Sequence, residues 1–453
     1  MEAHPRVLVV GQPFERTSGG GITLCNLFEG WPRDRLAAAV VSDRDLAFDV
    51  CDRYYALGAS EITWAWPLSL VRRTETPASK ATVARPSPGQ TPASAARAQP
   101  GFVKRAFRRG LDALGAEDAL RSMHLSDRLR DWIVEFKPDL VYSQLSDLPT
   151  MTLVSEILDA TGLSFALHVM DDWPSSMYRR GAFSRIVRGR ADRALASLLR
   201  RAGARMAISD AMAYEYQARY GRQFLSFHNP VDLDRWDALA AASDVTLVHS
   251  ANEDLRLVYT GRVGTGNVDT LFDVAQVVSE MSSQGRHISL QVNTPNADSD
   301  AAIRLMACRG VTVTLAGDYS RVPGLMAAAD VLLLPLDFDE QSVRLMRLSM
   351  PTKVSEYLAS GKPVLTYAPR GSAVAEYARD GGWSLLVDRP DPASLRQALS
   401  SLVGDPEGRE AMGAAGRALA IQRHDATKVR AAFAAQLAEA ASGPVPAAGR
   451  AES

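Results

Sequence analysis

The sequence has few cysteines, no long apolar run and no excess of either charge. Its 453 residues include only Cys25, Cys51 and Cys308, which lie far apart and form no C-x-x-C pair. That spacing argues against a disulfide framework or a structural zinc site, and it favours reduced thiols in a cytoplasmic protein. No apolar run approaches the ~18 residues of a membrane-spanning helix. The first residues also lack the basic and apolar regions of a signal peptide.

The charge balance excludes one class of partner. Lysine and arginine number 51 against 52 acidic residues, so the formal net charge is −1. A duplex-binding protein usually carries a basic excess, so we expect no nucleic-acid partner. The hydrophobic share of 46% is that of a globular protein. At roughly 100–200 residues per domain, the length predicts two or three domains.

Short apolar runs alternate with stretches of helical period along most of the chain. The first run is 6–10, and the pattern predicts an α/β protein with parallel sheets and right-handed crossovers. The later runs are 140–142, 164–169, 204–208, 255–259, 288–292, 311–315, 331–334 and 363–366, with helices expected at 127–136, 211–220, 270–281 and 353–359.

The alternation stops near Asn229-Pro-Val-Asp232 and restarts at Leu255. We therefore expect two Rossmann-like domains that face a shared cleft, where such folds bind ligands. The N-terminal domain is expected at 1–230 and the C-terminal domain at 231–424. A helix at 425–441 is expected to pack back on the N-terminal domain, followed by a disordered tail at 442–453.

One segment does not fit the alternation. Residues 71–101 are rich in Pro, Ala, Ser, Thr and Arg and predict a disordered insert. Residues 102–114 then predict a basic amphipathic helix, which either binds an anionic membrane surface or docks its apolar face on the N-terminal domain. Residues 71–110 hold nine basic residues and one acidic residue, so they carry +8 and the rest of the chain −9.

Two features of the N-terminal half are candidates for a site. Gly19, Gly20 and Gly21 open a predicted helix and leave backbone N–H groups for an anion, or serve only as a tight turn. Their spacing fits neither G-x-G-x-x-G nor a P-loop. His168 ends an apolar strand just before Asp171 and Asp172, so we expect it to face the cleft; a structural role is the alternative.

The C-terminal half offers cations and a carboxylate. Arg262 lies in a glycine-rich loop after a strand, and arginine suits bidentate phosphate binding. Thr352 and Lys353 follow Pro351 at a helix start, which favours an anion. Glu356 follows one turn later and could accept hydrogen bonds from the vicinal hydroxyls of a ribose. The alternative is that Lys353 and Glu356 form a surface pair.

These motifs, in this order, resemble the GT-B-fold glycosyltransferases of family 4, which are retaining enzymes that use nucleotide-sugars. The similarity covers roughly 6–420 without the insert, and its most specific part is Pro351-Thr-Lys-Val-Ser-Glu-Tyr-Leu-Ala-Ser-Gly-Lys-Pro-Val364. The resemblance implies an acceptor-side N-terminal domain and a donor-binding C-terminal domain. It implies that Glu356 binds the donor ribose, that Arg262 binds phosphate and that the loop 316–319 reads the base.

The resemblance also assigns roles to the other candidate residues. It implies catalytic roles for His168, Lys353 and Arg262 and acceptor-side positions for Asp171 and Asp172. The implied donor-binding residues are Gly20, Gly21, Asn229, Gly317, Arg344, Ser349, Thr352 and Glu356.

Two positions depart from the family pattern. Leu348 stands where the first glutamate of the signature is expected, and Asn267 stands where a phosphate-binding lysine is expected. Lys353, with Arg344 or Arg347, could supply that charge, and both departures occur in the Pro-Thr-Lys-x-x-Glu-Tyr branch. Asp337-Phe-Asp339 matches the D-x-D metal motif of the other glycosyltransferase fold, but here a chance match or an exposed loop is the better interpretation.

The resemblance thus implies a retaining, hexose-type glycosyltransferase that needs no metal and no cofactor. Its partners would be a nucleotide-diphosphate sugar and a glycan, lipid-linked or small-molecule acceptor. The expected location is cytoplasmic or peripheral on the inner face of the plasma membrane, in cell-surface polysaccharide synthesis. The alternatives are a non-catalytic nucleotide-sugar-binding protein and a nucleotide-sugar epimerase of the same fold.

Overall fold

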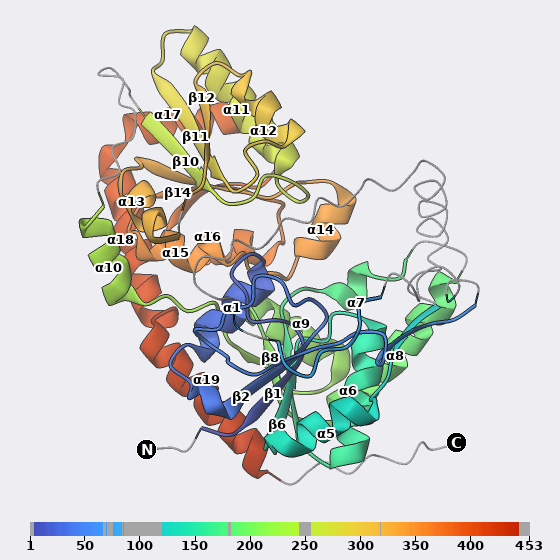
Figure 1. Cartoon of the computed structure of the whole chain (residues 1–453). Helices are drawn as coiled ribbons and strands as arrows, with labels where there is room; N and C mark the ends of the chain where they lie inside the picture. Colours follow the sequence, from blue (N-terminus) through green and yellow to red (C-terminus); the bar gives the residue numbers. More distant parts are fainter. Residues whose placement is uncertain are drawn as a thin grey trace. The chain divides into compact units, whose positions relative to one another are not determined.

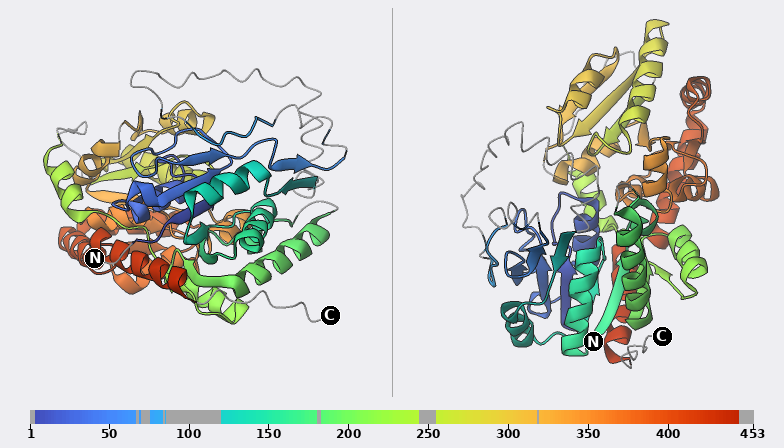
Figure 2. Two further views of the ribbon diagram at one scale, coloured as in Figure 1. Left: turned by 60° about the horizontal axis from the view of Figure 1, so that its bottom comes forward. Right: turned by 90° about the vertical axis from the view of Figure 1, so that its right-hand side faces the viewer.

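The chain forms two compact units (Figures 1 and 2). The computed structural model describes residues 4–66, 69, 76–83, 85, 120–179, 183–243, 255–317 and 319–443. Unit 1 comprises the chain up to Ser226 together with the chain from Arg430 onward, and unit 2 is Phe227–Val429. The chain therefore passes from one unit to the other twice.

Unit 1 is built on a parallel sheet whose first strand is central. Among the described residues its strand order is β3-β2-β1-β6-β7-β8-β9, and a small antiparallel pair, β4 and β5, lies outside it. The strands are β1 (Val7–Gly11), β2 (Leu36–Val40), β3 (Tyr54–Ala56), β4 (Ile62–Trp64), β5 (Arg121–Met123), β6 (Leu140–Ser143), β7 (Ser164–Val169), β8 (Ala202–Ala207) and β9 (Leu225–Ser226).

The helices of unit 1 come from both ends of the chain. Helices α6 and α8 pack together, whereas α1 contacts the C-terminal helix α19 through the rings of Phe28 and Phe433, 5.1 Å apart. The helices are α1 (Gly19–Phe28), η1 (Arg33–Arg35), α5 (Asp127–Phe136), α6 (Leu148–Thr161), α7 (Trp173–Ser176), α8 (Ser184–Arg201), α9 (Asp210–Tyr220) and α19 (Ala426–Ser442).

Part of the predicted disordered insert is folded. Ser79 is buried, its hydroxyl donates to the buried carboxylate of Glu61, and its carbonyl accepts from Arg128 at 2.9 Å. Lys80 pairs with the edge strand β3 at Ala56. The prediction of disorder is therefore wrong for 76–83, because polar side chains anchor this stretch where apolar ones are scarce. Residues 86–119, with the helix expected at 102–114, and the tail from 444 lie outside the described residues.

Unit 2 repeats the architecture. Its strand order in the described chain is β12-β11-β10-β13-β14-β15, all parallel, with the first strand again central. The strands are β10 (Leu255–Thr260), β11 (Ile288–Thr294), β12 (Val311–Leu315), β13 (Val331–Pro335), β14 (Val364–Tyr367) and β15 (Ser384–Val387).

Apolar side chains of the sheet, α11 and α17 form the core of unit 2, which includes Leu257, Val274 and Leu399. Helix α15 packs beside α18. The helices are α10 (Leu233–Ala241), α11 (Val268–Ser283), α12 (Asp300–Met306), η2 (Tyr319–Arg321), α13 (Val322–Ala327), α14 (Glu340–Met346), α15 (Lys353–Ala359), α16 (Ala373–Gly381), α17 (Pro392–Gly404) and α18 (Pro406–Arg423).

Candidate functional site

The candidate site lies at the carboxyl ends of the central strands of unit 2. Strands β11 and β12 lie on one side of β10 and β13–β15 on the other, so the topological switch point, where such folds bind ligands, lies between β10 and β13. These strands pair at Leu257–Val331 and Val258–Leu332. Nearer their carboxyl ends the hydroxyl of Tyr357 bridges them, because it donates to the Leu333 carbonyl (3.1 Å) and accepts from the Thr260 N–H (3.3 Å).

Asn267 closes the loop that follows β10. Its side-chain oxygen accepts from the Gly264 N–H at 3.1 Å, and its side-chain nitrogen donates to the Arg262 carbonyl and the Tyr259 hydroxyl, both at 3.0 Å. The Asn267 amide therefore holds the loop together, and the Arg262 side chain is exposed to solvent.

Lys353 lies against this loop from α15. Its Nζ donates to the Tyr259 hydroxyl at 3.0 Å and lies 4.2 Å from the centre of the Tyr259 ring. Gly261 has φ +137°, which favours glycine, and a Cβ there would come 2.7 Å from Lys353 Nζ and displace the ammonium. Burial lowers the pKa of Lys353, while Tyr357 and Glu356 act in the opposite direction.

Glu356 lies one turn further along α15 and is buried. Its Oε1 accepts a hydrogen bond from the hydroxyl of Tyr319, whose side chain is 50% exposed and belongs to the segment predicted to read a base. Burial raises the pKa of Glu356, and the Tyr319 hydrogen bond and Lys353 lower it. The carboxylate is thus placed to accept hydroxyl hydrogens, the chemistry that ribose binding requires.

Asn229 supports α15 from inside unit 2. Its side-chain nitrogen donates to the Thr352 carbonyl at 3.0 Å and to the Ser355 hydroxyl at 3.1 Å, and Asn229 is only 4% exposed. The structure therefore places this predicted donor-binding residue, with Thr352, at the start of the helix that carries Lys353.

The other predicted residues of unit 2 have local partners. Arg344 is exposed and forms an ion pair with Glu340 on its own helix. Ser349 is buried and donates to the Leu345 carbonyl at 3.1 Å. Leu348 is 4% exposed, and Gly317 is exposed in the loop before Tyr319.

Asp337 and Asp339 each cap a different helix. Asp337 accepts from the N–H and hydroxyl of Thr270 in the first turn of α11, both at 2.9 Å, and burial raises its pKa. Asp339 accepts from the N–H groups of Gln341 and Ser342 at the start of α14, and the hydrogen bond with Ser342 lowers its pKa. Within the described chain no cluster of three or more His, Cys, Asp or Glu could hold a metal ion.

His168 lies in the core of unit 1, so the prediction that it faces a cleft is wrong. It is 0% exposed, and its Nδ1 shares a hydrogen bond of 2.9 Å with the Tyr142 hydroxyl. Its ring lies 6.3 Å from that of Phe433 on α19. Burial lowers the pKa of His168 to about 3, so the imidazole is neutral. Helix α19 thus places Phe433 beside His168 at the end of β7, where the sequence pattern predicted a cleft.

Asp172 is also engaged inside unit 1. Its carboxylate accepts from Arg219 at 2.9 and 3.3 Å and from the Tyr216 hydroxyl at 3.0 Å, and it is 0% exposed. These bonds raise the pKa of Arg219 against the opposing effect of burial. The ion pair between the partly exposed Arg219 and the buried Asp172 fixes α9 to the end of β7, so Asp172 does not reach an acceptor, whereas Asp171 is exposed.

The glycine-rich start of α1 already holds a carboxylate. Glu15 is buried, and it accepts from the N–H groups and hydroxyls of Thr17 and Ser18. A Cβ on Gly21 would come 2.3 Å from Glu15 Oε1, and the Gly21 N–H bonds to Ser18. The steric interpretation therefore holds for Gly21, while Gly20 is partly exposed in the first turn.

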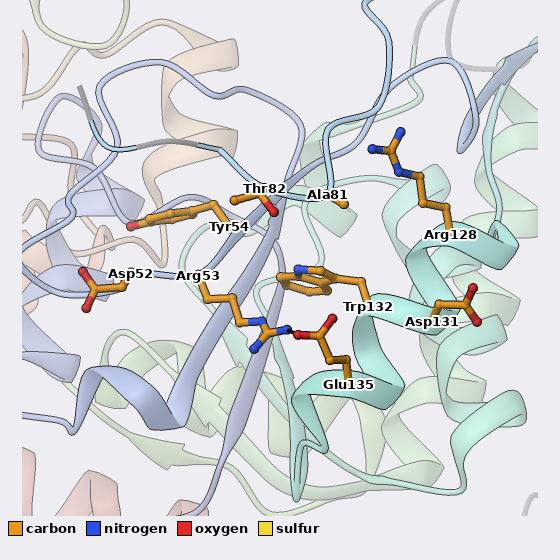
Figure 3. Close-up of a pocket in the computed structure, with 9 residues that line it drawn as sticks. All are labelled: Asp52, Arg53, Tyr54, Ala81, Thr82, Arg128, Asp131, Trp132 and Glu135. Atoms are coloured by element: carbon orange, nitrogen blue, oxygen red, sulfur yellow. Dashed lines mark hydrogen bonds and ion pairs between the residues drawn. The ribbon is translucent and has the colours of Figure 1, made fainter. Parts of the chain in front are cut away.

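Two open grooves lie away from these strand ends. The groove in Figure 3, about 450 Å³, runs between α5 and the start of β3, where Arg53 points toward Glu135 and forms an ion pair with it. The groove in unit 2, about 470 Å³, is lined by Asp330 and Lys362, which precede β13 and β14. Both lie at amino-terminal strand ends, so we assign neither as the ligand crevice.

One family model and several solved structures are similar to this chain. Residues 254–405, about a third of the chain, match the family model described as glycosyl transferases group 1, and this stretch contains the candidate site. No curated protein sequence matches the chain.

Among solved structures, the chain is similar to HepE of Anabaena, crystallised with UDP and glucose (TM-score 0.59, 13% identity, 96% of this chain and 99% of that one). It is also similar to sucrose-phosphate synthase from Thermosynechococcus elongatus (0.58, 12%, 95% and 98%). A third is a UDP-forming alpha,alpha-trehalose-phosphate synthase from Burkholderia xenovorans (0.56, 12%, 97% and 100%). At these identities the likeness concerns the fold: two Rossmann-like parallel-sheet domains of the GT-B type.

Proposed function

We propose that the protein is a glycosyltransferase that moves a hexose-type sugar from a nucleotide-diphosphate sugar to an acceptor. The observation that carries the proposal is Lys353 and Glu356 on one face of α15, at the switch point of a domain matching glycosyl transferases group 1. The Lys353 ammonium beside the glycine-rich loop suits the diphosphate of such a donor. The Glu356 carboxylate suits the hydroxyls of its ribose. The proposals that the enzyme is of the family 4 type and retains the anomeric configuration of the sugar rest on the sequence motif at 351–364.

The site residues supply charge where the reaction develops it. Loss of a diphosphate leaves an oxocarbenium-like sugar and a leaving group that gathers negative charge. Lys353, held against Tyr259, and the exposed Arg262 offset that charge in place of a metal ion. The Glu356 carboxylate exchanges the Tyr319 hydroxyl for ribose hydroxyls. The departing phosphate takes the proton of the acceptor hydroxyl, so no separate carboxylate base is required.

The corrected positions in unit 1 narrow this mechanism. His168 and Asp172 lie in the core and stabilise the fold, so neither takes part in the transfer. The HepE structures with UDP, glucose or UDP-glucose support a uridine nucleotide and a hexose as the first ligands to test.

The setting of the reaction is part of the same proposal. A glycan or lipid-linked acceptor would place the protein in cell-surface polysaccharide synthesis, peripheral on the cytoplasmic face of a membrane. No helix in the described parts of the chain is long and apolar enough to span a bilayer. The basic segment 102–114 is the proposed contact, and it lies outside the described residues.

The deciding experiment combines a thermal-shift screen with a hydrolysis assay. The purified chain is heated with UDP, GDP, ADP and their glucose or mannose conjugates; a ligand at 100 times its Kd stabilises by about 2.7 kcal/mol. The stabilising donor is then incubated with mixed glycan and lipid-linked acceptors, and nucleotide release is measured. Acceptor-dependent release supports the proposal. Nucleotide release without an acceptor product indicates the epimerase, and binding without turnover indicates the non-catalytic alternative. No stabilising nucleotide would overturn all three.

A further inference from the structure

The hydroxyl of Tyr259 joins three segments of the candidate site. It donates to the Arg262 carbonyl at 2.7 Å, and it accepts from Asn267 and from Lys353 Nζ, both at 3.0 Å. A tyrosine hydroxyl has one hydrogen and two lone pairs, so these three bonds use its full capacity. Tyr259 is 0% exposed, and burial raises its pKa, which keeps the hydroxyl protonated at neutral pH.

We propose that Tyr259 is a positioning residue that aims the Lys353 ammonium at the diphosphate of the donor. The inference rests on the proposed function. One N–H of the ammonium is directed at the Tyr259 oxygen, and because the ammonium is tetrahedral this fixes the directions of the other two. The ring adds a second restraint, since Lys353 Nζ lies 4.2 Å from its centre.

The arrangement explains how the site works with an amide at position 267. The Asn267 side chain makes three hydrogen bonds within the loop, and a lysine could not reproduce the bond that it accepts from Gly264. The positive charge therefore comes from α15, and the space at Gly261 admits it. Tyr259 contacts both Asn267 and Lys353, so the shape of the loop and the direction of the cation are set by one oxygen.

The test separates diphosphate binding from nucleoside binding. Tyr259→Phe keeps the ring and removes the hydroxyl, and Kd is measured by calorimetry for UDP against uridine and for GDP against guanosine. We expect diphosphate affinity to fall about tenfold and nucleoside affinity to stay unchanged, because only the diphosphate meets Lys353. The matched control is Tyr367→Phe, another buried tyrosine of this sheet, whose hydroxyl bonds to Asp273 at 3.0 Å; both affinities should stay unchanged.

A double-mutant cycle shows whether Tyr259 acts through Lys353. In a Lys353→Met background, adding Tyr259→Phe should cause no further loss of diphosphate affinity. Independent losses that multiply, or an equal loss for nucleoside and diphosphate, would overturn the inference. So would wild-type affinities in a folded Tyr259→Phe protein.

A second variant covers the case in which Tyr259→Phe does not fold. Gly261→Ala places a methyl group 2.7 Å from Lys353 Nζ and 3.2 Å from the Tyr259 hydroxyl oxygen, so it disturbs the contact between the two directly. The same selective loss is expected from it, and unchanged diphosphate binding would contradict the inference. A wild-type chain that binds neither UDP nor GDP overturns the proposed function itself. Normal wild-type binding without the selective losses overturns only the role of Tyr259.

Discussion

Lowering the pH from 8 to 5 should reduce the free energy of unfolding of unit 1 by about 2 kcal/mol through His168 alone. The pKa of this ring falls from 6.5 to about 3 on burial. Below pH 6.5 the ring of the unfolded chain binds a proton that the folded chain excludes, so stability falls as the pH falls. The loss is absent above about pH 7 and grows until about pH 3. At pH 5, 1.5 units below 6.5, it amounts to 1.5 times about 1.4 kcal/mol.

The assay is urea unfolding of the wild type and of His168→Asn at pH 8 and pH 5. The asparagine amide can still reach the Tyr142 hydroxyl but does not titrate. All other titrating groups are the same in both proteins, so their contributions to the pH dependence of the unfolding free energy cancel. The wild type should lose about 2 kcal/mol more than the variant between the two pH values. The same pH dependence in both proteins would refute the reasoning, since it would mean that the ring accepts a proton in the folded state.

Three further predictions concern the site, the ion pair and the insert. Lys353→Ala and Glu356→Ala should each lower turnover at least about tenfold in a protein that unfolds at the wild-type temperature; wild-type rates would remove both residues from the site. Arg219→Ala leaves the Asp172 carboxylate with one partner and should cost about 1–3 kcal/mol in urea unfolding, whereas the exposed Arg193→Ala should cost under about 0.5 kcal/mol. Deleting 86–110, which spares the folded stretch 76–83, should weaken sedimentation with anionic but not neutral vesicles. Unchanged sedimentation would assign the basic segment another role.

The buried strands and helices were the most predictable part of the fold. The apolar run 164–169 and the helical patterns 127–136 and 353–359 coincide with β7, α5 and α15. Strand β2 was not predicted, because Leu36–Val40 is mostly alanine, which has little intrinsic preference for a strand. It forms a strand because it pairs with β1 on one side and β3 on the other.

The proximity of candidate residues was predictable where a single element carries them. Lys353 and Glu356 share one helix turn, so their spacing in the sequence already places them together. The contact between Tyr259 and Lys353 was missed because the two residues are 94 positions apart, and strand periodicity marks Tyr259 only as a buried residue. His168 was misplaced for the same reason, because the side chain that covers it, Phe433, comes from the far end of the chain.

The position of Phe433 has a consequence for synthesis on the ribosome. Its ring packs against those of Phe28, Tyr142 and His168, so the core of unit 1 combines residues made before unit 2 with a residue made after it. During translation the rings that Phe433 contacts in unit 1 therefore stay uncovered until unit 2 has been made. A nascent chain arrested before residue 430 therefore contains all of unit 2 and a unit 1 whose core lacks the Phe433 ring.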